Sequence, residues 1–133
     1  MAYDADELQA LYDLGYALYQ AGALTDARFL WEGVSQIDPG AETAFRLLGL
    51  IARDEGRHED AIALARAAFE REPTPAAALI RAEAWLATGR FGEALRDLER
   101  LALAPPVADG LTPLRDRAAA LLARLRRPAQ TRP

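Results

Sequence analysis

The sequence contains no cysteine and no lysine, and it has a single histidine, His58. The absence of cysteine excludes disulfides, cysteine-ligated zinc and cysteine nucleophiles. No run approaches the roughly 20 apolar residues that a membrane-spanning helix needs, so membrane insertion is not expected. Glycine-rich phosphate loops, serine elbows and paired-histidine helices are also missing. These absences predict a protein that is not an enzyme and that uses no metal and no cofactor.

The charge is spread unevenly along the 133 residues. Residues 1–75 carry 14 acids and 6 arginines, a net charge of −8, whereas residues 76–133 carry 6 acids and 10 arginines, a net charge of +4. Nucleic-acid binding needs a clustered basic face, so a nucleic-acid partner is not expected. The N-terminus, MAYDADELQ, lacks the basic and apolar regions of a secretory signal, which favours a cytoplasmic protein.

A repeat with a spacing of 34 and then 33 residues runs through most of the chain. Three sets of marker residues keep this spacing: Gly22, Gly56 and Gly89, then Ala27, Ala61 and Ala94, and then Pro39, Pro73 and Pro106. Three independent markers with one period indicate tandem structural units. Because such a unit cannot bury its apolar stripe alone, the units are expected to stack.

Each unit has the pattern of two amphipathic helices joined by a tight turn, and no strand pattern is present. The helices are predicted at about 8–20, 25–37, 42–54, 59–71, 75–87 and 92–103. Gly22 permits the break after the first helix, and Thr25 is the expected N-cap of the next. Thr74, followed by Pro75, is the expected N-cap of the fifth helix. Gly15 and Gly49 are small where two helix axes are expected to approach closely.

These positions resemble the tetratricopeptide repeat (TPR). The first unit matches its pattern with Leu11, Leu14, Gly15, Leu18, Gly22, Ala27, Trp31 and Pro39, and the third departs from it at Arg81 and Ala82. The resemblance implies an all-α fold in which three tandem helical hairpins form a right-handed superhelical solenoid. The repeats are expected at about 8–41, 42–74 and 75–106, within a single domain spanning 1–127.

A further helix is predicted at about 111–127, where leucines recur at helical spacing with arginines on the other side. Solenoids end in an atypical helix that shields the last repeat, so this segment is expected to be a cap. The last residues, 128–133, are expected to form a disordered tail.

The segment LYDLGYALYQAG, residues 11–22, places Tyr12, Tyr16 and Tyr19 on one stripe of a helix. Leu11, Leu14 and Leu18 follow a second stripe, which is expected to face the partner helix. In the TPR resemblance the first helix of each hairpin lines a concave groove. The implied peptide-binding residues are Tyr12, Tyr16, Tyr19, Gln20, Arg46, Leu50, Arg53, Leu79, Glu83 and Leu86.

Tyrosine and leucine would supply apolar contact to an extended peptide, and Arg46 and Arg53 would donate to its carbonyls or carboxylates. The alternative is that the tyrosines pack against an N-terminal helix, a second copy of the chain or the C-terminal helix. TPR proteins that clamp a C-terminal carboxylate use lysine and asparagine at the inner positions. This chain has no lysine and carries Tyr16 where the asparagine would stand, which disfavours that ligand.

The tyrosine run, together with TDARFLWEGVSQIDP and IRAEAWLATGRFGEA, is similar to the class II chaperones of bacterial type III secretion. That resemblance implies a cytoplasmic chaperone that holds a hydrophobic translocator through its concave groove, with a protein or extended peptide as partner. A homodimer is one option for its oligomeric state. The alternative function is a scaffold or adaptor in another multiprotein assembly that uses the convex face or the C-terminal helix. A regulatory domain that binds a transcription factor or an enzyme is the weakest of the three hypotheses.

Overall fold

The computed structural model describes residues 3–103 and 112–127, and within these ranges it contains seven α-helices and no strand. The helices are α1 (Ala5–Gln20), α2 (Leu24–Ile37), α3 (Glu42–Asp54), α4 (His58–Arg71), α5 (Pro75–Ala87), α6 (Phe91–Leu103) and α7 (Thr112–Arg126). The all-α prediction is therefore confirmed. The predicted bounds of α3 and α5 are correct to the residue, and α1 begins earlier because the Asp4 carboxylate caps it.

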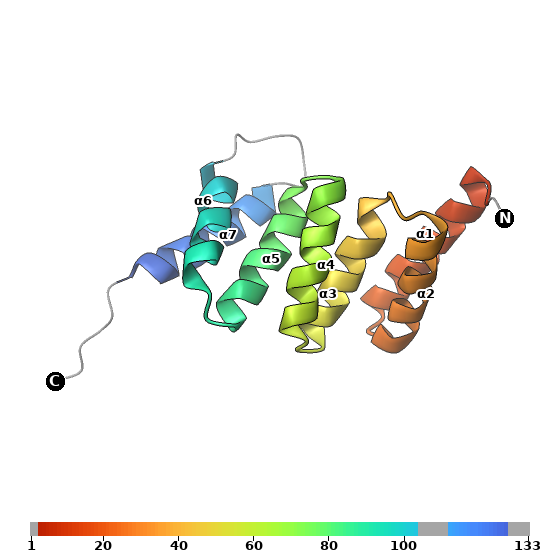
Figure 1. The fold of residues 1–133 in the computed structure, drawn as a ribbon, viewed down its shortest axis with the longest axis horizontal. Helices are drawn as coiled ribbons and strands as arrows, with labels where there is room; N and C mark the ends of the chain where they lie inside the picture. The colour runs from red at the N-terminus through yellow and green to blue at the C-terminus, as the bar shows by residue number, and fades with distance from the viewer. Residues whose placement is uncertain (1–2, 104–111, 128–133) are drawn as a thin grey trace.

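The six helices of the repeats form three hairpins that stand side by side in a row (Figure 1). Each helix packs mainly against the helices before and after it, and α3 also contacts α5. The helix α7 packs on α6 and α5 at the C-terminal end of the row, as expected for a cap. This arrangement is a helical solenoid in which α1, α3 and α5 are the first helices of successive hairpins.

The turn inside each hairpin uses the predicted glycine. Gly22, Gly56 and Gly89 have φ angles of 77°, 76° and 78°, in the left-handed region that only glycine enters without strain. The predicted N-cap at Thr74 is confirmed, since its hydroxyl accepts a hydrogen bond from the Ala77 amide at 3.2 Å. The prediction for Thr25 was wrong. Helix α2 begins one residue earlier, after Ala23, and no side chain caps it.

The helix interfaces depend on small residues. The marker alanines Ala27, Ala61 and Ala94 are completely buried. A methyl group at Gly15 would lie 2.5 Å from the Trp31 ring, so α1 can approach α2 only with glycine there. A methyl group at Gly49 would lie 3.5 Å from the nearest atom, which is an ordinary contact. The two glycines share a repeat position, but only Gly15 is required by close packing.

The leucine stripe of α1 is only partly buried. Leu11 and Leu18 pack against the first core cluster, as predicted, but half of Leu14 is exposed. Leu14 is therefore less buried than its place in the leucine stripe predicts. Its equivalent in the second repeat, Leu48, is 7% exposed because it belongs to the cluster formed between α2 and α3. No described helix precedes α1, so the same repeat position remains open there.

The departure of the third repeat from the pattern has a structural explanation. Arg81 stands where Leu14 and Leu48 stand in the other repeats, and it pairs with Asp97 through two hydrogen bonds of 2.9 Å. Asp97 in turn stands where the other repeats have Leu30 and Leu64. A buried ion pair thus replaces two leucines, and the Arg81 guanidinium also lies over the rings of Phe69 and Trp85.

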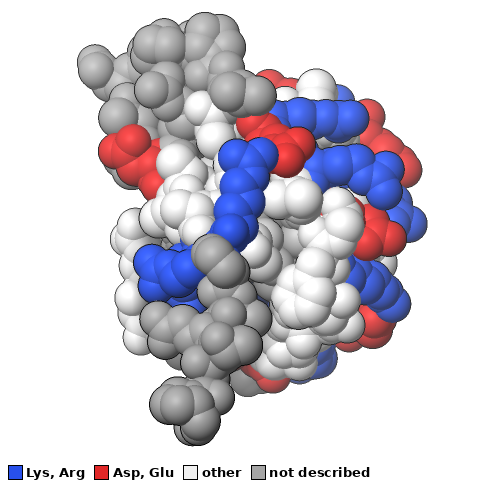
Figure 2. Space-filling model, turned by 90° about the vertical axis from the view of Figure 1, so that its left-hand side faces the viewer, with Lys and Arg blue, Asp and Glu red and all other residues white. Residues whose placement is uncertain are grey.

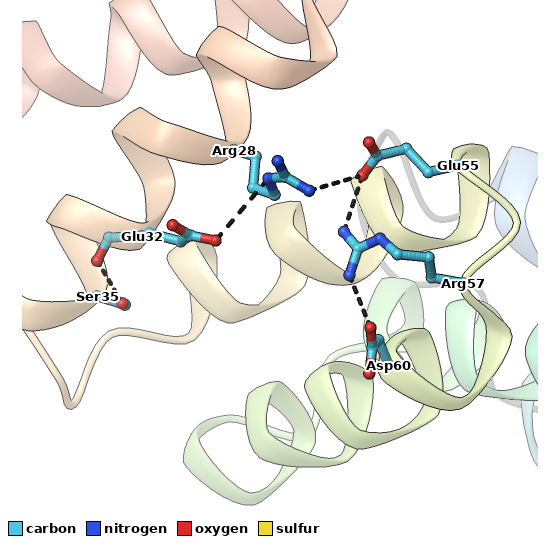
Figure 3. A network of polar contacts seen from close by, with 6 residues as sticks. All are labelled: Arg28, Glu32, Ser35, Glu55, Arg57 and Asp60. Carbon is cyan, nitrogen blue, oxygen red and sulfur yellow. Dashed lines mark hydrogen bonds and ion pairs between the residues drawn. The ribbon is translucent and has the colours of Figure 1, made fainter.

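Ion pairs connect neighbouring repeats at the end where the hairpins turn. The guanidinium of Arg28 on α2 lies 3.8 Å from the carboxylate of Glu55, which also accepts a hydrogen bond from Arg57. Arg57 donates a second hydrogen bond to Asp60 on α4 (Figure 3). The third repeat is connected in the same way, because Arg90 pairs with Glu59 at 2.9 Å. These contacts are exposed and add little stability individually, but each joins a side chain of one repeat to an oppositely charged side chain of the next.

Several predictions lie outside the described residues: Pro106, the first residue of the predicted cap at position 111, and the tail at 128–133. The domain limits of 1–127 and the end of the third repeat therefore stay predictions. Within the described ranges, no helix combines the length and the apolar character required to cross a membrane.

Candidate peptide-binding face

The tyrosines of α1 lie against a buried tryptophan. Trp31 on α2 is fully buried, and the rings of Tyr12 and Tyr16 both meet it edge to face, with centroids 5.4 Å apart. Both tyrosines are half-buried, so each ring has one side on the core and another available to solvent. This packing explains why one helix carries two apolar stripes. The tyrosine stripe covers Trp31, and Gly15 between them lets the tryptophan come close.

A chain of polar contacts crosses the three first helices. The hydroxyl of Tyr19 on α1 donates to Asp54 on α3 at 2.7 Å. Arg53, next to Asp54, bonds to it at 3.1 Å and reaches Glu83 on α5 at 3.3 Å. The side chains of α1, α3 and α5 therefore meet on one face of the solenoid, which we call the tyrosine face. It contains Tyr12, Tyr16, Tyr19, Arg46, Leu50, Arg53, Asp54, Glu83 and Leu86.

Tyr12 and Tyr19 of this face stay neutral at physiological pH. Burial raises the pKa of the Tyr12 hydroxyl, and the carboxylate of Asp38 raises it further. Burial also raises the pKa of Tyr19, and the hydrogen bond to Asp54 adds to this increase. Both hydroxyls are thus protonated, and each is directed at a carboxylate of the chain itself, Asp38 for Tyr12 and Asp54 for Tyr19, so the rings rather than the hydroxyl protons are left to contact a ligand.

The two arginines of the tyrosine face already have carboxylate partners. Arg46 pairs with Glu42 at 2.9 Å, and Glu42 also accepts from Thr74. Burial opposes the charge on Arg46, but Glu42 outweighs that effect and raises its pKa. For Arg53, burial likewise lowers the pKa, but the carboxylates of Glu83 and Asp54 outweigh burial and raise the pKa. That these arginines donate to peptide carbonyls or carboxylates stays a prediction, but the structure shows that their charge is already matched within the chain.

The remaining predicted residues divide into three groups. Leu50 and Leu86 are partly exposed and extend the apolar surface along α3 and α5. Gln20 is exposed at the end of α1. Leu79 is only 3% exposed and belongs to the core shared with α6 and α7, so its prediction as a ligand contact was wrong. Its helix turns this position inward, whereas Tyr12 at the equivalent position of α1 is half-buried.

Two features of this face were missed by the sequence analysis. Trp31 was matched to the repeat pattern, but its role as the support beneath two tyrosines was not predicted. The signal was its place in the repeat, since the equivalent residues Ala65 and Leu98 are smaller. The contact between Tyr19 and Asp54 spans 35 positions and has no signature in either helix alone.

The described residues contain no group of three or more His, Asp or Glu side chains arranged to hold a metal ion. That the tyrosine face forms a groove stays a prediction. The hollows identified on the molecule include two beside α1 and α2 and one between α6 and α7, and the three tyrosines of the stripe line none of these.

Comparison with known proteins identifies the family. A family model described as tetratricopeptide repeat matches residues 2–42 and 43–109. The chain belongs to the tetratricopeptide repeat family. No curated protein sequence matches the chain significantly.

Solved structures with the same TPR arrangement include PcrH from Pseudomonas aeruginosa, with a TM-score of 0.84, 26% identity, and coverage of 93% of this chain and 95% of that chain. PcrH in complex with the chaperone binding region of PopD gives a TM-score of 0.83 at 27% identity, over 92% and 93% of the two chains. The Yersinia enterocolitica type III secretion translocator chaperone SycD gives 0.80 at 25% identity, over 91% of each chain. These similarities confirm the solenoid and the resemblance to translocator chaperones.

Proposed function

We propose that this protein is a non-enzymatic, cytoplasmic chaperone that binds an extended segment of a secreted translocator against its tyrosine face. The observation that carries the proposal is the row of half-buried phenol rings on α1, supported from beneath by Trp31. The similarity to PcrH supports it, because PcrH has been crystallised with the chaperone binding regions of both PopD and PopB.

The chemistry of the face indicates what kind of segment would bind. Its arginines and acids pair with each other, so little uncompensated charge is left for a ligand. Affinity would then come from apolar side chains buried against the tyrosines and Leu50, at about 25 cal/mol per Å², less the cost of ordering the peptide. An internal, uncharged and largely apolar segment fits this face better than a charged chain end. Covering such a segment would keep an aggregation-prone client in solution before export.

The client can be recovered by affinity purification of the tagged protein from its own cells, followed by mass spectrometry. We expect a secreted protein with hydrophobic segments. Titration of the recovered segment can then be followed by the fluorescence of Trp31 in a Trp85→Phe background, where Trp31 is the remaining tryptophan. Because Tyr12 and Tyr16 touch Trp31, a ligand on these rings should change its emission.

The substitution Tyr16→Ala should weaken binding of the recovered segment by roughly 1–3 kcal/mol per folded molecule, because it removes a central aromatic contact. Circular dichroism and urea unfolding establish how much of the variant is folded. Ala63→Asp, on an exposed position of α4, is the matched control and should bind normally. Recovery of no secreted client, or unchanged affinity of folded Tyr16→Ala, would contradict the proposal.

A further inference from the structure

The solenoid has an unpaired apolar surface at its N-terminal end, on the opposite side of α1 from the tyrosines. Phe29 is 77% exposed, Leu14 50% and Tyr3 38%. Two hollows of 360 Å³ each lie here, and both are lined by Tyr3 and Leu11. We call this surface the N-terminal edge. Monomeric proteins rarely expose several large apolar side chains next to hollows that share walls, which marks the edge as an interaction surface.

The repeat indicates the shape of the missing partner. In the second repeat, the position equivalent to Leu14 is Leu48, and it is buried in the cluster that the preceding helix α2 contributes to. The surface of α1 is built on the same plan as that of α3 but has no described helix in front of it. What fits against α1 is therefore an α-helix with an apolar stripe, docking as α2 docks on α3.

The charge around the edge indicates the partner's polar residues. Residues 1–27 contain five acids and no basic residue. Glu7 lines one hollow and Asp26 the other. The nearest arginine in the sequence, Arg28, is already paired with Glu32 and Glu55 (Figure 3). Two copies of the edge would bring acids against acids, which opposes a symmetric contact between identical chains.

We propose that the N-terminal edge docks a basic amphipathic helix of a partner protein, at a site separate from the tyrosine face. The apolar stripe of that helix would cover Leu14, Leu11 and Phe29, and its arginine or lysine side chains would meet Glu7 and Asp26. The protein would then hold two polypeptides at once, one on each side of α1. This inference does not depend on the identity of the client.

The proposal can be tested with two labelled synthetic peptides of about 18 residues, both designed as helices with the same leucine stripe. One has arginine and the other glutamate on the polar face, and fluorescence anisotropy measures their binding to the full chain. The arginine peptide should bind more tightly by about tenfold or more. Leu14→Asp and Phe29→Asp should each weaken its binding by about tenfold, because each places a charge in the apolar stripe.

Two controls make the result specific. Ala63→Asp occupies the position of Phe29 in the second repeat and adds the same charge, so it should leave the affinity unchanged. Tyr16→Ala should also leave it unchanged, which separates this site from the tyrosine face. Equal binding of the two peptides, or full binding by both edge variants, would overturn the proposal. Sedimentation that reveals self-association abolished by Leu14→Asp would assign the edge to a second copy and overturn it as well.

Discussion

The two ends of the solenoid are built from the same repeat but finished differently. At the C-terminal end, α7 covers the third repeat, and its residues Ala118 and Leu122 are buried with Leu98 and Leu101 of α6. At the N-terminal end, no described helix covers α1, and Leu14 is half exposed. Burial of a repeat position is therefore decided by the neighbour that stands next to it. The residue type at that position does not decide it.

The two ends also differ in charge. The hollows of the N-terminal edge have Glu7 and Asp26 in their walls. A hollow of 480 Å³ between α6 and α7 is instead lined by Phe91, Arg124 and Arg126. Figure 2 looks onto this C-terminal end and shows basic side chains across its centre beside uncharged surface. The uneven charge along the sequence thus appears in the walls of these hollows, although Arg126 also pairs with Glu99 at 2.8 Å.

The largest expected effect concerns the ion pair that distinguishes the third repeat from the first. Asp97→Leu should destabilise the protein by roughly 3–5 kcal/mol, because it leaves the Arg81 guanidinium without a partner in a mostly buried site. Urea unfolding monitored by circular dichroism measures this change. The double variant Arg81→Leu with Asp97→Leu restores the leucine pair of the other repeats and should recover most of the lost stability.

The stability of the Arg81→Leu, Asp97→Leu double variant also tests whether the third repeat needs the ion pair for packing. If it is as unstable as Asp97→Leu alone, the space between α5 and α6 does not accept the leucines of the other repeats. The ion pair would then be a packing requirement of the capped end.

A medium effect is expected where equivalent leucines have different neighbours. Leu48→Ala should cost about 2–4 kcal/mol, because it opens a cavity in the cluster between α2 and α3. Leu14→Ala should cost less than about 1 kcal/mol, because half of that side chain is already in water. Thermal and urea unfolding of both variants give the comparison. Similar losses for the two would show that Leu14 is covered in solution, for example by another chain.

The smallest expected effect compares two glycines at one repeat position. Gly15→Ala should destabilise by about 1–3 kcal/mol, since its methyl group would overlap the Trp31 ring, which is fully buried and cannot move aside. Gly49→Ala has room for the methyl group and should be neutral or stabilising by up to about 1 kcal/mol, through the higher helix propensity of alanine. A destabilised Gly49→Ala with a neutral Gly15→Ala would reverse the interpretation of the two interfaces.

Local sequence features predicted most of the fold. The glycines with positive φ, the buried alanines and the Thr74 cap all act through backbone conformation or size within a few residues, so their spacing was sufficient. The remaining differences have one cause. Leu14 was assigned from helix periodicity, and Leu79 and the two arginines of the tyrosine face from the TPR resemblance, but their exposure and partners come largely from other helices. The pairing of Arg46 with Glu42, four residues apart, was the exception that the sequence could have revealed.

The sequence by itself determined that this chain forms stacked helical hairpins, because a 34-residue spacing of glycine, alanine and proline permits little else. It also determined that the tyrosines share one side of α1, since helical geometry alone places them there. Only the tertiary structure decided that Trp31 supports those rings, that the arginines are neutralised and that the N-terminal edge is open. Those properties depend on which side chains meet across helices, and that contact pattern is set by the packing of all repeats together.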